Sequence, residues 1–209
     1  MEKSETSLHD VAEIGIIIAA YLILTFLSFK HPMRIEWIWR VPQALLPFVF
    51  VVSRNRTIGS IGLKSENMAE NLKLGVSVAG ILTVVFAPLY LKWLPGDLFS
   101  PSYPAGWLFM FIFVVTNVFV IELFYRGWIQ TRLTEAGGPI PGIIGASALA
   151  SFDFFEFSIF PRGIPSVIII VTAALVFSYL FYKTESLVTP LIAHVLWFHL
   201  VLVVLTLLG

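Results

Sequence analysis

The sequence predicts an all-α protein, a polytopic transmembrane helical bundle of about seven spans. Of its 209 residues, 58% are hydrophobic and only 12% are charged, and the mean hydropathy of +0.91 is far above that of a soluble domain. The apolar residues form long runs close to the roughly 20 residues that a membrane-spanning helix needs. Short connections join these runs, so neighbouring spans must pack together. We therefore expect one membrane domain, residues 1–209.

The connections identify the individual spans and one clear turn. The second run contains Arg40, Pro42 and Pro47, which favour a kinked, tilted or partly interfacial helix. Gly137-Gly138-Pro139 is a strong turn signal and predicts that the fourth and fifth spans form an antiparallel hairpin. The predicted spans are 11–29, 36–53, 72–91, 105–132, 140–160, 164–182 and 187–208.

Charge and cysteine content limit the function and orientation. The 13 basic and 13 acidic residues balance, which argues against a nucleic-acid partner. The absence of cysteine excludes a thiol nucleophile, disulfides and thiolate metal sites. Lys and Arg concentrate at 54–73 and after the fourth span, so these connections should be cytoplasmic. We expect an integral protein of the bilayer, in a prokaryotic cell membrane, with a cytoplasmic N-terminus.

Glu122 and Arg126 are the most informative residues, because both lie in the fourth apolar run. An ionisable group inside a span costs roughly 2.5 to 3.5 kcal/mol on insertion scales, so it usually has a partner or a function. Their four-residue spacing places both on one helical face, where the side chains can touch. The pair is either a structural ion pair or part of a functional site.

Two further carboxyl groups are predicted at the depth of Glu122. Glu122 precedes the hairpin turn by about as many residues as Asp153 and Glu156 follow it. Because a helix rises about 1.5 Å per residue, the three carboxyl groups should lie at the same depth in the membrane, within roughly one helical turn. They can then face one another. The alternative is that Asp153 and Glu156 only mark the outer end of the fifth span.

The last span contributes His194 and His199. Their five-residue spacing separates them by about 140° around a helix, so we expect that one site does not use both. His194 lies well inside the span. It is either a hydrogen-bonded packing residue or, beside a carboxylate from another helix, a group that positions or deprotonates water.

Three segments resemble the CAAX protease and bacteriocin-processing family, also called the Abi family. They are Glu122-Leu-Phe-Tyr-Arg126-Gly127, Ser147-Ala-Leu-Ala-Ser-Phe152 and Thr189-Pro-Leu-Ile-Ala-His194. The family pattern is EExxxR, then FxxxH, then HxxxN or HxxxD, on neighbouring helices. The resemblance covers about 105–208, the family-like core, and implies an intramembrane endopeptidase whose glutamate activates water to cleave a membrane-associated peptide or protein.

The chain departs from this pattern at three positions. Ile121 occupies the position of the first Glu, which is the water-activating residue in active members. Glu156 stands where the second motif has His, and Phe198 where the third has Asn or Asp. The resemblance therefore implies a catalytic set of Glu122, Arg126, Glu156 and His194.

Three classes of function follow from these residues. In the first, Glu122 or Glu156 is the general base on a water oriented by His194. In the second, the chain is a catalytically inactive relative, a membrane scaffold that binds a peptide or a protein partner. The third is a proton-coupled carrier that uses the buried ionisable groups as a relay. No cofactor is expected, although Glu122, Glu156 and His194 are plausible ligand types for a metal.

Overall fold

Every regular element in the described part of the chain is a helix. The computed structural model describes residues 32–93, 104–157 and 164–208, together with Gly15 and Ala19. The elements are α2 (Pro32–Ser53), η1 (Ile58–Ile61), α3 (Met68–Trp93), α4 (Pro104–Glu122), η3 (Leu123–Gln130), α5 (Thr131–Gly137), α6 (Pro139–Phe157), α7 (Ile164–Thr184) and α8 (Val188–Leu208). The all-α prediction is confirmed for these residues.

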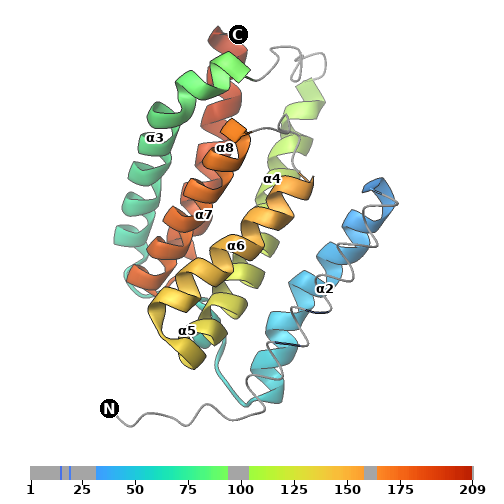
Figure 1. Cartoon of the computed structure of the whole chain (residues 1–209), viewed down its shortest axis with the longest axis vertical. Helices are drawn as coiled ribbons and strands as arrows, with labels where there is room; N and C mark the ends of the chain where they lie inside the picture. Colours follow the sequence, from blue (N-terminus) through green and yellow to red (C-terminus); the bar gives the residue numbers. More distant parts are fainter. Residues whose placement is uncertain (1–14, 16–18, 20–31, 94–103, 158–163, 209) are drawn as a thin grey trace.

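The predicted hairpin is present at Gly138. Helix α4, the π-helical segment η3 and α5 follow one another without interruption, and α6 returns alongside them (Figure 1). Gly138 has φ of +89°, a positive value that glycine adopts without strain, and its N–H donates to the carbonyl of Thr134. Pro139 begins α6, where a missing N–H costs nothing. The Gly-Gly-Pro signal therefore marks both helix ends correctly.

Helices α3 and α8 pack closely along their length, at the side of the bundle opposite to α2 (Figure 1). Gly75 of α3 makes this approach possible, since a Cβ there would lie 2.8 Å from the carbonyl oxygen of Thr189. Ala79 and Ala193 are fully buried in the same interface. Small residues at contact positions are typical of helix pairs in membranes, where close packing replaces the hydrophobic effect.

The outer surface of the bundle is apolar, as expected for a protein in lipid. Val52, Val84 and Ile164 are each at least three-quarters exposed. Three helical stretches among the described residues are long and apolar enough to cross a membrane: Met68–Leu89, Phe111–Gly137 and Ile164–Thr184. The chain is therefore an integral helical membrane protein.

The predicted number of seven spans is not supported by these helices. Two further helices have shorter apolar stretches, Arg40–Ser53 and Val188–Val204. The first of these lies in α2, which contains Pro42 and Pro47 as the sequence indicated. The predicted span at 11–29 lies outside the described residues, except for Gly15 and Ala19.

Candidate functional site

The segment that carries Glu122 and Arg126 has an unusual helical form. After Glu122 the chain changes from an α-helix to a π-helix over Leu123–Gln130, and all eight of these residues are buried. π-helical turns are rare and often occur at functional sites. Gly127 in this segment contacts η1 so closely that a Cβ would lie 2.6 Å from the carbonyl oxygen of Ile61. The motif residues are therefore held rigidly in the centre of the molecule.

Glu122, Arg126 and His194 form one buried polar cluster. The Oε1 atom of Glu122 is 2.7 Å from Nδ1 of His194, and its Oε2 atom is 3.4 Å from Nε of Arg126. Each of the three residues is at most 3% exposed. An ionised carboxylate can only accept hydrogen bonds, so the imidazole donates its Nδ1–H, and the ring lone pair is then on Nε2. Oε1 of Glu122 is hydrogen-bonded to His194, whereas Oε2 has the ion-pair contact with Arg126 and no hydrogen bond among the described residues.

Neighbouring helices fix the positions of the two partners of Glu122. The Nη2 atom of Arg126 donates to the carbonyl of Ala174 on α7 at 3.2 Å. The His194 ring stacks on Phe177, also on α7, with ring centroids 4.7 Å apart. The helix that carries Glu122 and Arg126 therefore converges with α7 and α8 on one site. The sequence predicted this convergence for Glu122 and His194.

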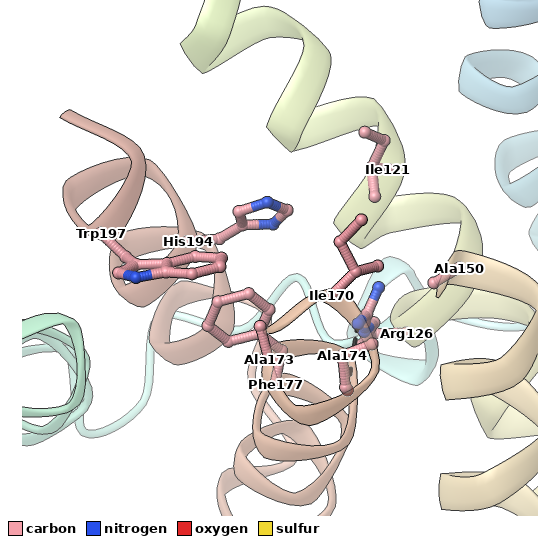
Figure 2. A pocket seen from close by; sticks show the side chains of 9 residues that line it. All are labelled: Ile121, Arg126, Ala150, Ile170, Ala173, Ala174, Phe177, His194 and Trp197. Atoms are coloured by element: carbon pink, nitrogen blue, oxygen red, sulfur yellow. Dashed lines mark hydrogen bonds between the residues drawn. The ribbon is translucent and has the colours of Figure 1, made fainter. Parts of the chain in front are cut away.

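A small, mostly apolar pocket lies beside this cluster. Figure 2 shows His194 and Trp197 on one side of it and Arg126 and Ile121 on the other. The space amounts to about 310 Å³, although only a small part of it is wide enough for a water molecule. Arg126 and His194 are its charged or titratable lining residues, and alanine, isoleucine and aromatic side chains complete the wall. The pocket thus presents an imidazole and a guanidinium to an otherwise apolar space.

Asp153 belongs to a second buried network, and the prediction that it could face Glu122 is wrong. Its Oδ2 atom is 2.8 Å from Nη1 of Arg40 on α2 and accepts a longer hydrogen bond from Gln43. Gln43 also donates to the hydroxyl of Tyr125 in the π-helical segment. Counting residues from the turn does not identify this partner, because it comes from α2, which packs against α4 and η3.

The remaining predicted site residues have separate environments. His199 donates Nδ1–H to the carbonyl of Val195 and packs on Phe111, so the two histidines do belong to different sites. Phe198 lies against a small apolar cluster that includes Val114. The side chain of Glu156 lies outside the described residues.

Several buried polar residues were not among the predicted site residues. The sequence pattern marks Arg40 only as an interruption of the second span, and it does not distinguish Gln43, Tyr125 or Gln130 as site residues. Arg40 and Gln43 lie three residues apart in an apolar run, which is the same kind of signal as Glu122 and Arg126. Among the residues whose side chains are described, no group of three or more His, Asp or Glu side chains is placed to hold a metal.

The fold and this cluster define a polytopic helical membrane protein with an ionised site inside the bundle. Residues 103–199 match the model of the family described as type II CAAX prenyl endopeptidase, Rce1-like. This match covers slightly less than half of the chain and includes Glu122, Arg126 and His194. It confirms the resemblance to the CAAX protease family found in the motifs. No curated protein and no solved structure matches the chain.

Proposed function

We propose that this protein is an intramembrane endopeptidase of the CAAX protease type that hydrolyses a membrane-associated peptide or protein. The observation that carries the proposal is the buried contact of 2.7 Å between Glu122 and His194 beside a pocket. In this arrangement Nε2 of His194 takes a proton from water, and Glu122 holds the imidazole in the required tautomer and balances the charge that forms. This division of roles resembles that of other carboxylate–histidine pairs.

Arg126 has the second role in this proposal. Its guanidinium lines the pocket and carries five N–H groups, of which those on Nε and Nη2 already face Glu122 and Ala174. The remaining N–H groups are suited to stabilise the negative charge that develops on the carbonyl oxygen of the scissile bond. Arg126 would thereby replace the side-chain donor that Phe198 cannot provide.

The reaction is tested by cleavage assays with purified protein in liposomes. The substrates are prenylated CAAX peptides, leader peptides and transmembrane segments, and the variants are His194→Ala, Glu122→Gln and Glu156→Gln. We expect His194→Ala to lose at least about 100-fold in rate, the usual contribution of a general base. His199→Ala is the matched control, because His199 lies on the same helix but outside the pocket. Equal rates for wild type and His194→Ala would refute the mechanism.

A second candidate is a relative that binds membrane peptides without cleaving them. Ile121 favours it, because an aliphatic side chain lines the pocket where active relatives carry the water-activating Glu. The same liposomes distinguish the two functions. Binding of a transmembrane peptide with no cleavage by the wild type, and with cleavage gained by Ile121→Glu, would support the second candidate.

The end of the bundle that carries the η1 loop and the α5–α6 turn is proposed to face the cytoplasm. Arg54, Arg56, Lys64 and Arg132 all lie at this end, which is the distribution expected for a cytoplasmic side. Because the chain has no cysteine, single cysteines at exposed positions can be labelled from either side with an impermeant thiol reagent. Labelling of Arg54→Cys only from outside intact cells would refute this orientation.

A further inference from the structure

A larger and more polar cavity lies at the opposite end of the π-helical segment from Glu122. It is bounded by the η1 loop, by the end of η3 with the start of α5, and by the last turns of α7. Its space amounts to about 760 Å³, part of which is open to solvent. Ser60, Gln130 and Thr131 contribute polar groups to it, and Phe181 and Tyr182 form an aromatic wall. The proposed catalytic residues do not line this cavity.

The cavity is rich in hydrogen-bond acceptors. Gln130 is only 1% exposed, and its Nε2 atom donates to the carbonyl of Ser178 at 2.7 Å, while its Oε1 atom has no hydrogen-bond partner among the described residues. The hydroxyl of Ser60 donates to the carbonyl of Thr57, and that of Thr131 donates to the carbonyl of Gly127. Each hydroxyl has used its proton and keeps lone pairs. The Oε1 atom of Gln130 is therefore the buried acceptor at this cavity that lacks a donor among the described residues.

The cations around the cavity are already paired with carboxylates. Lys64 is 3.0 Å from Glu185, and both Arg56 and Arg132 bind Glu135. An ionised phosphodiester would have to separate these pairs, and it has no N–H or O–H group to donate to Gln130. A peptide main chain brings N–H donors and carries no charge. The chemistry of the lining therefore favours a peptide main chain over the phosphodiester of a lipid.

We propose that this cavity binds a main-chain segment of the polypeptide substrate, with a peptide N–H donating to Oε1 of Gln130. The inference rests on the proposed function, because it names where the substrate is held outside the membrane. The cavity lies at the basic end of the bundle, so the bound residues are the hydrophilic ones that flank the membrane-embedded part. This site selects substrates by the presence of an extended polar segment and not by its side chains.

Disulfide cross-linking, with copper phenanthroline as the oxidant, tests the proposal, because every introduced cysteine is unique in this chain. The protein variant Ser60→Cys is placed in phosphatidylcholine liposomes with a synthetic peptide that has an apolar span followed by a Gly-Ser tail containing one cysteine. We expect cross-linking at least about ten times faster than for the exposed control Glu66→Cys. Adding Gln130→Leu should slow it by about fivefold, the effect of losing one hydrogen bond. Thr131→Val is a second, gentler substitution that should slow it in the same direction.

The same measurement separates this site from the reaction. Cross-linking is repeated with His194→Ala also present, and we expect the same rate because binding does not need the imidazole. A thiol-headgroup phospholipid, phosphatidylthioethanol, replaces the peptide in a parallel sample. Equal peptide rates at positions 60 and 66, no effect of Gln130→Leu in a folded protein, or faster reaction with the lipid than with the peptide would each overturn the proposal.

Discussion

The buried ion pair between Glu122 and Arg126 predicts a specific pattern in a double-mutant cycle. Glu122→Gln alone and Arg126→Met alone each leave one charge in the bundle without its main counter-charge. Removing one partner of a buried pair costs about 3 to 5 kcal/mol in the free energy of unfolding. Replacing both partners removes both charges, so we expect the double variant to be clearly more stable than the sum of the single losses predicts.

Thermal unfolding in detergent measures these losses. For a chain of this length, 1 kcal/mol corresponds to about 2–4 °C in Tm, so each single variant should lose about 6–20 °C. Glu185→Gln is the matched control, because it removes one partner of the Lys64–Glu185 pair, in which Glu185 is 77% exposed on its side chain. Such an exposed pair contributes less than about 1 kcal/mol. If the double variant lost the full sum of the single losses, the reasoning about uncompensated charge would be wrong.

Two further substitutions test the packing around the site. Gly127→Ala should lower the free energy of unfolding by about 1–3 kcal/mol, since its Cβ would overlap the carbonyl oxygen of Ile61. Gly80→Ala on α3 is the control, because its Cβ would have nothing within 4 Å, and it should change the free energy of unfolding little in the same experiment. Asp153→Asn should cost about 3 kcal/mol or more, because it removes the buried anion that faces Arg40. A loss no larger than that of the half-exposed Glu135→Gln would show that this pair does not hold α2 in place.

The helices and their turns could be predicted from the sequence because lipid imposes a strong pattern. Long apolar runs gave six helices near their observed positions, and Gly137-Gly138-Pro139 gave the hairpin. The contact of Glu122 with Arg126 follows from helical spacing alone. The approach of His194 to Glu122 was predictable as a tendency, since an ionisable group inside a bundle needs a partner from another helix.

The partner of Asp153 could not be predicted by the same reasoning. Residue counting from a turn gives the depth of a side chain, but it does not give the direction in which the side chain points around its helix. The π-helical segment also turns less per residue than an α-helix, and nothing in its composition announces it. The position of α2, which decides the environment of Asp153, depends on packing between segments far apart in the sequence.

The contact between Gly127 and Ile61 has a consequence for how the protein is made. Ile61 is fully buried against partners that include the motif helix, yet it is synthesised more than sixty residues before that helix. The neighbouring Gly62 gains its hydrogen-bond partner still later in synthesis, since its carbonyl accepts from the N–H of Leu187. The segment around η1 therefore completes its native contacts only after Leu187, near the C-terminal end of the sequence, has been synthesised.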